Sequence, residues 1–374
     1  MTTGESGSFA YANPGTIHWG AGSLAAKLDH ELNQHGLQRA FIVSTRSVSG
    51  QVALGGRLRE VLGTRCVGEF GAIGQHAPAA AVAAAVEEAR AAEPDVLVSF
   101  GGGSPIDAAK SVAFALATGL DLSHPNAAET ARGMRPSRLL PHVAIPTTLS
   151  AAELSGLAGF TTEAEHEKVG LRGEALIPAV VIFDAVLSLH TPLDLWLSTG
   201  IRSVDHAVET LLAPGSHPLQ DTLALEALRR LRASLLATHA DPTDLAARTE
   251  SQLGAWFSFT LPGPAAAGLS HTLGKRIGSR HDIPHGVSSC LLLPHVMRYL
   301  APRTQLQQAR IAAALVVPPT CAADAIQDLI ASLGLPQHLS DYGLSDADLE
   351  AAARPVASET YPFDDLLGIY RAAR

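Results

Sequence analysis

The sequence predicts a two-domain protein, with an α/β domain over residues 1–185 and an all-α domain over residues 186–374. A chain of 374 residues is too long for one ordinary domain. In the first half, short apolar runs alternate with helix-periodic segments, which is typical of crossover units on a mostly parallel sheet. After residue 185 the segments are long and helix-periodic, without a convincing strand. We expect the functional site in the cleft between the domains.

The elements of the first domain follow from apolar runs and one alanine-rich segment. Four runs rich in strand formers supply the expected strands: 39–45 (RAFIVST), 94–100 (PDVLVSF), 142–148 (HVAIPTT) and 178–184 (PAVVIFD). Residues 77–93 predict a helix, because Pro78 lies near the first turn, where a missing N–H costs little. In the second domain, residues 193–212, 219–240 and 245–262 repeat apolar side chains at helical spacing.

Composition excludes several classes of function. The net charge is −9 and no long run of Lys or Arg occurs, which argues against a nucleic-acid partner. No apolar stretch reaches the roughly 18 residues of a membrane span, and the first residues lack the pattern of a signal peptide. The three cysteines form no CxxC pair and are typical of reduced thiols. We therefore expect a cytoplasmic protein without a membrane partner.

A glycine-rich turn follows the strand expected at 94–100 and opens a helix. Gly101, Gly102 and Gly103 have no side chains, so their backbone N–H groups can approach an anion closely. Ser104 adds a hydroxyl, and the helix N-terminus adds partial positive charge. The turn matches neither the G-x-G-x-x-G fingerprint nor the Walker A loop. It predicts a phosphate site, and the alternative is a tight strand-to-helix turn.

Two further elements are candidates for cofactor contacts. Thr147 and Thr148 end the strand at 142–148, where their hydroxyls can donate to a pyrophosphate or ribose. Lys168 precedes the strand at 178–184 and can reach a phosphate, although an exposed lysine is the alternative. The strand at 39–45, which we take as the first, ends at Thr45 rather than at the Asp or Glu that NAD-specific sites place there. With Arg46 close by, both NAD and NADP remain open.

Three histidines of the second half lie on two motifs. Arg202 and His206 are four residues apart on a predicted helix and share a face, whereas Asp205 is expected to point elsewhere. His271 and Lys275 repeat this spacing, and His285 follows after a loop. A histidine four residues from a cation is usually structural, so the spacing alone leaves open whether the three histidines converge.

Together these motifs resemble the iron-containing alcohol dehydrogenase superfamily. The motifs are GGGSPIDAAK, PTTLSAAE, HAVE, GLSH and PHGVSSCLLLPHVMRY, in that order along the chain. STR, QHAP and TTLSAAELS resemble the maleylacetate reductase branch more than the metal-dependent members. The resemblance implies a dehydroquinate synthase-like architecture, with an N-terminal dinucleotide-binding domain and a helical C-terminal domain, an NAD or NADP cofactor, and a homodimer. It also implies that Gly102, Gly103 and Ser104 hold the pyrophosphate, and that Thr147, Thr148 and Lys168 line the cofactor. We add Gly101, Asp107 and Thr45 to the cofactor-binding candidates.

The departures from the superfamily pattern concern the metal. In the metal-dependent members the ligands are an Asp, a His four residues later, the leading His of His-x-x-x-His and the His of Pro-His-Gly. Here His206, His271 and His285 take the three histidine positions, but Arg202 takes the Asp position, and Lys275 replaces the second His of His-x-x-x-His. A guanidinium remains cationic in proteins and repels a divalent ion by several kcal/mol at about 4 Å, even at an effective dielectric of about 20. We expect no catalytic metal.

A pocket with Arg202, Lys275 and three histidines favours an anionic, carboxylate substrate. The resemblance then implies hydride transfer to an oxo-carboxylic acid, with Lys275 or a histidine donating the proton and Arg202 holding a carboxylate or the oxyanion. His271 and His285 are secondary acid–base candidates, and His76 is a weaker one on a loop that can face the cleft. The alternatives are a non-redox lyase, cyclase or dehydratase with Lys275 as base or nucleophile, and an inactive binding protein.

Overall fold

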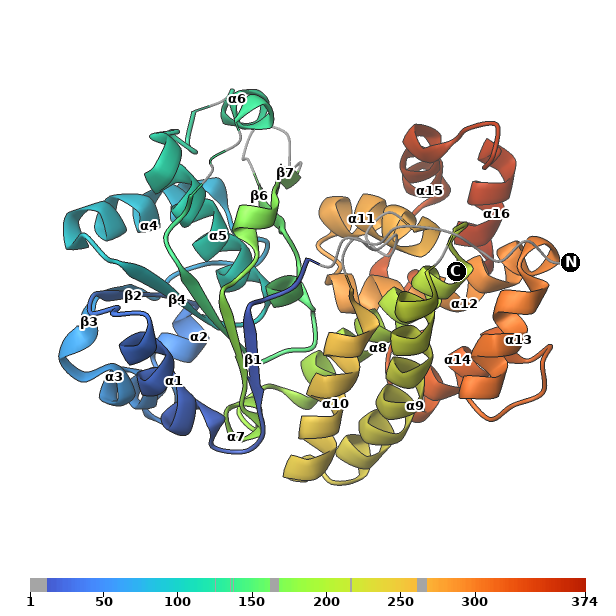
Figure 1. Cartoon of the computed structure of the whole chain (residues 1–374). Coiled ribbons are helices and arrows are strands. Elements are labelled where there is room, and N and C mark those ends of the chain that lie inside the picture. The colour runs from blue at the N-terminus through green and yellow to red at the C-terminus, as the bar shows by residue number, and fades with distance from the viewer. Residues whose placement is uncertain are drawn as a thin grey trace, which may run out of the picture.

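The computed structural model describes residues 12–124, 126–134, 136, 138–161, 168–215, 217–260 and 268–374. It has the predicted class of fold: a parallel sheet flanked by helices, followed by a helical domain that lies beside it (Figure 1). The last strand of the sheet ends at Phe183, and every described element after it is a helix. No described helix is both long and apolar enough to cross a membrane.

All neighbouring strands of the six-stranded sheet are parallel, in the order β1-β8-β5-β4-β2-β3. In chain order these strands are β1 (Thr16–Trp19), β2 (Ala40–Ser44), β3 (Cys66–Phe70), β4 (Val96–Gly101), β5 (His142–Pro146) and β8 (Val180–Phe183). A separate antiparallel hairpin joins β6 (Leu157–Thr161) and β7 (Lys168–Arg172).

Helices cover both faces of the sheet, and so the central strands are apolar on both sides. Phe41, Val43 and Leu97 point into one apolar cluster with α4 and α5, and the alternate residues Ile42 and Val98 point into another with α1 and α3. The helices of this domain are α1 (Ser23–Gln34), α2 (Arg46–Ser49), α3 (Arg57–Leu62), α4 (Ala79–Ala92), α5 (Gly103–Thr118), α6 (Ala127–Gly133) and α7 (Ala185–Ser188).

Sequence reasoning missed four strands, β1, β3, β6 and β7, and the strand expected to be first is β2 rather than β1. β3 is an edge strand in which only the last residue, Phe70, is buried. β1 is an edge strand of four half-buried or exposed residues, so it lacks the buried apolar run of the central strands. β6 and β7 pair only with each other, and their mixture of glycine, polar and apolar residues gives no clear alternation. Pairing with a partner, rather than local pattern, makes these segments strands.

The order of the strands defines one crevice. From β2 the chain continues to β3 at one edge of the sheet. From β4 it continues to β5, on the side of the opposite edge. The direction of the connections therefore switches between β2 and β4. Ligands of open α/β sheets bind beyond the carboxyl ends of the strands at such a point. Thr45 follows β2, the glycine turn ends β4, and Thr147 follows β5. The fold therefore places the cofactor candidates together.

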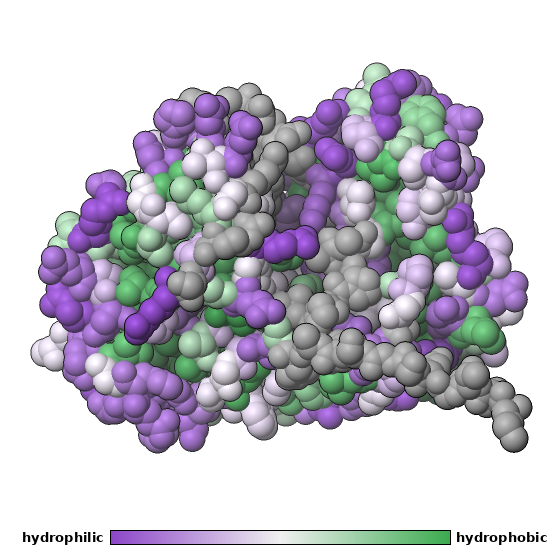
Figure 2. All heavy atoms as spheres, turned by 45° about the horizontal axis from the view of Figure 1, so that its top comes forward, coloured by the Kyte–Doolittle hydropathy of each residue, from purple (hydrophilic) through white to green (hydrophobic). Residues whose placement is uncertain are grey.

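The helical domain is built around α8, which is buried along nearly its whole length. Its helices are α8 (Leu193–Leu212), α9 (Pro218–Ala240), α10 (Leu245–Ser258), α11 (Leu269–His281), α12 (His285–Leu300), α13 (Gln305–Ala314), α14 (Ala322–Ser332), α15 (Asp346–Ala353) and α16 (Phe363–Ala372). The surface is hollowed between the two domains, and hydrophilic side chains gather at the rim (Figure 2).

Candidate active site

The glycine turn lies tightly against the turn that follows β5. Gly101 has a φ of 136°, a conformation that favours glycine. A Cβ on Gly102 would lie 3.2 Å from the Thr148 methyl, and one on Gly103 would lie 3.1 Å from the Ser150 hydroxyl. Within the described part of the chain, the hydroxyl oxygens of Thr148 and Ser150 are buried and have no hydrogen-bond partner. Buried hydroxyls facing a helix N-terminus fit the phosphates of a dinucleotide.

The other cofactor candidates take varied positions. The Thr147 N–H donates to the Gly101 carbonyl at 2.8 Å, which ties the two turns together. Thr45 is the N-cap residue of α2, and its hydroxyl is 2.9 Å from that of Ser47. Asp107 is half-buried, one turn into α5. The Lys168 backbone belongs to β7, and its side chain lies outside the described residues.

Two of the three candidate histidines of the second half lie side by side. His206 lies on α8 and His271 on α11, and their ring centroids are 4.8 Å apart. Phe259 packs edge-on against His206 at 5.0 Å. His285 is the first residue of α12, whose next residue, Gly286, would place a Cβ 2.7 Å from the backbone of Ser198. The glycine therefore permits the close approach of α12 to α8 at the residue that follows His285.

His76 reaches His285 from the other domain. Its ring centroid is 5.1 Å from that of His285, so the loop before α4 spans the cleft. His76 and Ala77 both have left-handed backbones, with φ of 59° and 51°. The His76 N–H donates to Ser104 and its carbonyl accepts from Thr161, which holds this strained pair. Strain of this kind concentrates at functional sites.

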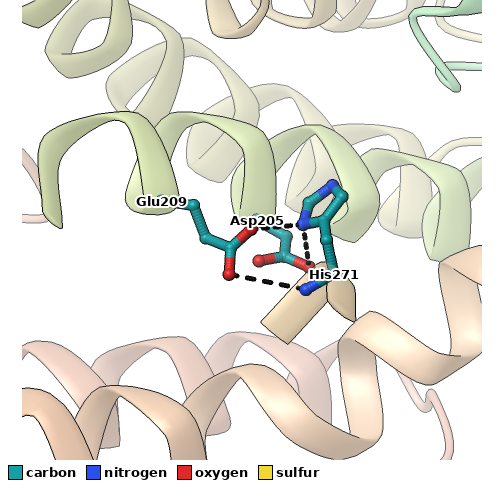
Figure 3. Close-up of side chains that lie close together, drawn as sticks. All are labelled: Asp205, Glu209 and His271. Atoms are coloured by element: carbon teal, nitrogen blue, oxygen red, sulfur yellow. Dashed lines mark hydrogen bonds and ion pairs between the residues drawn. The ribbon is translucent and has the colours of Figure 1, made fainter. Parts of the chain in front are cut away.

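Asp205 belongs to the site, which corrects the expectation that it points elsewhere. One Asp205 carboxylate oxygen lies 3.2 Å from His271 Nδ1, and a Glu209 oxygen lies 2.6 Å from the same nitrogen (Figure 3). Both carboxylates are almost completely buried. The sequence carried a signal for them, because Arg202, Asp205, His206 and Glu209 stand within eight residues of a helix whose only other charged residue is Asp194.

Glu209 also caps α11. Its Oε1 accepts the Ser270 N–H, in the first turn of that helix, where a carboxylate is favoured. Gly268 precedes α11, and a Cβ there would lie 2.1 Å from the Glu209 carboxylate. The glycine of the GLSH motif thus makes room for the acidic residue of the HAVE motif.

The charges in this cluster shift one another's pKa values. Burial alone would lower the pKa of His271, but Asp205 and Glu209 outweigh it and raise that pKa above its ordinary value. Burial, followed by the neighbouring cations His271, Arg202 and Lys275, lowers the pKa of His206 well below its ordinary value. His271 therefore favours the protonated form and His206 the neutral form.

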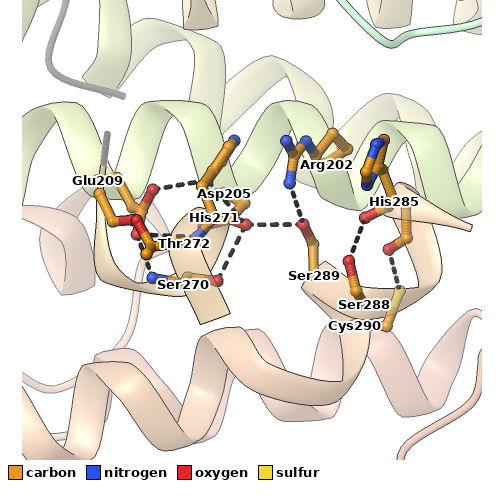
Figure 4. Close-up of polar contacts among 12 residues, drawn as sticks. Arg202, Asp205, Glu209, Ser270, His271, Thr272, His285, Ser288, Ser289 and Cys290 are labelled. Atoms are coloured by element: carbon orange, nitrogen blue, oxygen red, sulfur yellow. Dashed lines mark hydrogen bonds and ion pairs between the residues drawn. The ribbon is translucent and has the colours of Figure 1, made fainter. Parts of the chain in front are cut away.

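The two cationic candidates differ in exposure. Arg202 is buried on α8, and its guanidinium donates to the Ser289 hydroxyl at 3.3 Å (Figure 4). Glu209, on the same helix as Arg202, forms its ion pair with His271. Lys275 is exposed one turn along α11 from His271, although its charge acts on His206. Of the two, Arg202 is the one fixed inside the protein.

A separate cavity of about 660 Å³ carries none of the candidates. Its lining comes from α1, α3, α7 and the short helical turn at residues 52–56, and includes Arg57, Glu60 and His190. It offers no convergent set of buried polar groups, so we do not place the active site there.

Comparison with known proteins identifies the family. Residues 14–185 match the pattern of the iron-containing alcohol dehydrogenases, and residues 196–366 match the C-terminal pattern of the same family. The chain belongs to the iron-containing alcohol dehydrogenase superfamily. A maleylacetate reductase from Rhizobium sp. (strain MTP-10005) is 31% identical over 355 residues, covering 94% of this chain and 92% of the relative. One from Pseudomonas sp. (strain P51) is 31% identical over 349 residues, covering 92% and 90%.

Solved structures agree with this assignment. The crystal structure of maleylacetate reductase from Agrobacterium tumefaciens is similar, with a TM-score of 0.82, 28% identity and coverage of 98% of both chains. Within the superfamily, the chain lies in the maleylacetate reductase branch. It is an oxidoreductase of an NAD(P)-dependent family.

The superfamily implies iron, but the residues at its metal positions do not fit a divalent cation. Arg202 puts a buried guanidinium at the position of the only anionic ligand. Its charge, with those of His271 and Lys275, already opposes a further positive charge at His206. A guanidinium has no lone pair to offer a metal. The one negative ligand is therefore replaced by a cation.

Asp205, Glu209 and His271 offer a second ligand set, since one ligand atom from each lies within 4.8 Å of the others. The contacts of these residues favour a proton on His271 Nδ1, between the two carboxylates, rather than a metal ion. His271 Nδ1 is at hydrogen-bond distance from Glu209, at 2.6 Å. The two carboxylates also accept the Ser270 N–H and the Ser270 and Ser289 hydroxyls. These donors already satisfy the carboxylate oxygens that they contact.

Proposed function

We propose that the chain is a metal-independent, NAD(P)H-dependent reductase of a small oxo-carboxylic acid similar to maleylacetate. The observation that carries this proposal is the buried guanidinium of Arg202 on the same helix as His206 and close to His271. A fixed guanidinium binds a carboxylate through paired N–H groups, and it is poorly suited to an uncharged alcohol. The similar maleylacetate reductases support an acid with more than one oxygen function.

In this proposal each residue has a defined role. The cofactor, when bound at the glycine turn, supplies a hydride to the electrophilic carbon of the substrate. Arg202 orients a substrate carboxylate, or stabilises the negative charge that develops on oxygen. His271 donates the proton that neutralises this oxygen, because Asp205 and Glu209 hold it toward the protonated form. His206 remains neutral and accepts hydrogen bonds.

Lys275 and His76 take supporting roles. Lys275 is exposed, so it lacks the desolvation that activates lysine nucleophiles, which weakens the lyase alternative. Its charge acts at the cleft as an additional attraction for a carboxylate. His76 lies against His285 across the cleft, where both rings can contact a substrate bound between the domains. We also propose that the chain forms a homodimer, which sedimentation analysis of the purified protein checks.

Arg202→Asp tests the central claim. The substitution restores an anionic ligand beside three histidines and removes the carboxylate anchor. We expect kcat/KM for maleylacetate to fall by about 100-fold, which corresponds to about 2.7 kcal/mol. We also expect the variant to gain a stoichiometric Zn²⁺ or Fe²⁺, measured by elemental analysis after exhaustive dialysis.

Arg232→Asp is the matched control, because it makes the same change of charge at an exposed position on α9. It should change neither metal content nor kcat/KM by more than about twofold. The proposal fails if wild-type protein holds a stoichiometric metal whose chelation abolishes reduction. It also fails if Arg202→Asp leaves turnover of the carboxylate substrate unchanged.

A further inference from the structure

A single oxygen of Asp205 connects three neighbouring elements. Asp205 Oδ2 accepts hydrogen bonds from the Ser289 hydroxyl at 2.7 Å and from the Ser270 hydroxyl at 3.0 Å. The same oxygen forms the ion pair with His271 Nδ1 at 3.2 Å. Asp205 is completely buried on α8, Ser270 and His271 are on α11, and Ser289 is on α12 (Figure 4). One carboxylate thus ties together the helices that supply the site.

Ser289 extends this connection to Arg202. A hydroxyl has one proton to donate, and Ser289 donates it to Asp205. Its lone pairs then face the Arg202 guanidinium, which donates to Ser289 at 3.3 Å. Asp205 is three residues from Arg202, on the same side of α8. The negative charge of Asp205 therefore polarises the Ser289 hydroxyl, whose oxygen accepts the hydrogen bond from Arg202.

The Arg202 guanidinium needs a hydrogen-bond partner such as Ser289 to hold it in one orientation. An arginine side chain has many rotamers, and it loses binding energy if it must be ordered each time a ligand binds. Among the described residues, Ser289 is the hydrogen-bond partner that the structure gives its guanidinium. The remaining N–H groups of the fork stay available to an anion.

We propose that Asp205 is the positioning residue of the site: through one oxygen it fixes His271 directly and Arg202 by way of Ser289. The two cationic groups then keep one geometry toward a bound carboxylate. This inference rests on the proposed function for the identity of the anion, and it adds two residues, Asp205 and Ser289, that touch no substrate themselves. Loss of the connection should therefore change substrate affinity separately from the chemical step.

A double-mutant cycle tests this inference in the full-length protein. Ser289→Ala removes the link but keeps Arg202, so KM for maleylacetate should rise about tenfold while kcat changes less than about threefold. In an Arg202→Ala background, Ser289→Ala should have no further effect on KM. Asp205→Asn, which keeps the shape but loses the charge, should change both kcat and KM, because it acts on His271 and on Arg202.

Ser270→Ala is the matched control. It removes a donor to the same Asp205 oxygen, yet the guanidinium donates to Ser289 and not to the Ser270 hydroxyl. We expect its KM to stay within about twofold of wild type. The inference is overturned if Ser270→Ala and Ser289→Ala raise KM equally. It is also overturned if Ser289→Ala acts equally with and without Arg202.

Calorimetric binding of maleate, an unreactive dicarboxylate, separates this inference from the proposed function. If no oxo-acid is reduced but maleate affinity shows the same dependence of Ser289→Ala on Arg202, the reductase proposal fails and the positioning role of Asp205 stands. If wild-type protein neither reduces an oxo-acid nor binds maleate, Arg202 holds no carboxylate and the inference fails as well.

Discussion

The two halves of the candidate site consist of different kinds of chemical group. At the cofactor end, glycines, hydroxyls and backbone N–H groups gather where adjacent parallel strands end. At the helical end, Arg202, Asp205, Glu209 and His271 form a buried set of charges on two helices. The first half has few charges to desolvate, whereas the second holds charges that are stable only together.

This difference predicts how each half responds to change. When a small neutral group is substituted, no unpaired buried charge remains, so the effect of the substitution should be steric and local. A buried charge that loses its partner leaves an uncompensated charge in a low dielectric, so damage should reach the stability of the fold. Three predictions test this contrast, in order of decreasing effect.

The largest effect is expected for Glu209→Ala. The change leaves His271 with one carboxylate and the N-terminus of α11 without its acceptor. We expect the free energy of unfolding to fall by about 4 kcal/mol, as for other broken buried ion pairs, measured by urea denaturation. Glu226→Ala removes an exposed partner of Arg229 and Arg230 and should cost about 0.5 kcal/mol. Equal costs would contradict the contrast.

A smaller effect is expected at Glu153, a buried carboxyl in the α/β domain. Burial raises the pKa of Glu153 from 4.5 to about 7, and its two oxygens have no hydrogen-bond partner within the described part of the chain. The folded protein therefore keeps a proton that the unfolded chain loses above pH 4.5. Stability should fall as the pH rises from 4.5 to 7, by about 3 kcal/mol at most.

Glu153→Gln removes this proton linkage and keeps the shape of the side chain. At pH 8 the variant should be more stable than wild type, and at pH 4 the two should be equal, measured by urea denaturation at both pH values. Identical pH dependence of the two proteins would show that Glu153 does not titrate in this range. The result sharpens the comparison, because Glu153 tests a buried carboxyl without an ion-pair partner among the residues that the structure describes, whereas the buried carboxylates of the helical domain lie against His271.

The smallest effect is expected for Gly102→Ala, which adds one methyl group 3.2 Å from the Thr148 methyl. We expect the affinity for NAD(P)H, measured by fluorescence titration, to fall about tenfold, with a change in stability of about 1 kcal/mol. Thr148→Ser removes the methyl group that the new Cβ meets, so the double variant should recover part of the affinity. Gly368→Ala, in open space on α16, should leave affinity unchanged.

The two halves also differ in how far the sequence predicted them. The positions of the glycine turn, Thr45, Thr147 and Thr148 at strand ends were predicted because each follows an apolar run directly, and parallel strands bring their carboxyl ends to one edge. The histidines were found from their spacing and from the superfamily resemblance. Asp205 was misplaced, since helical spacing gives the direction of a side chain but not the neighbour that it meets. Ser270 and Ser289 were missed, because a serine carries no distinctive signal of its own.

The sequence by itself determined the parallel sheet, the helical second half, the glycine turn after a buried strand and the presence of Arg202 where the superfamily pattern has a carboxylate. These features depend on periodicity, on strand ends and on residue identity, all of which are local. Only the tertiary structure decided that Asp205 and Glu209 meet His271, that His76 crosses the cleft to His285, and that Lys275 is exposed. Those outcomes depend on the packing of α8, α11 and α12, where a change of about one ångström decides whether two buried charges pair.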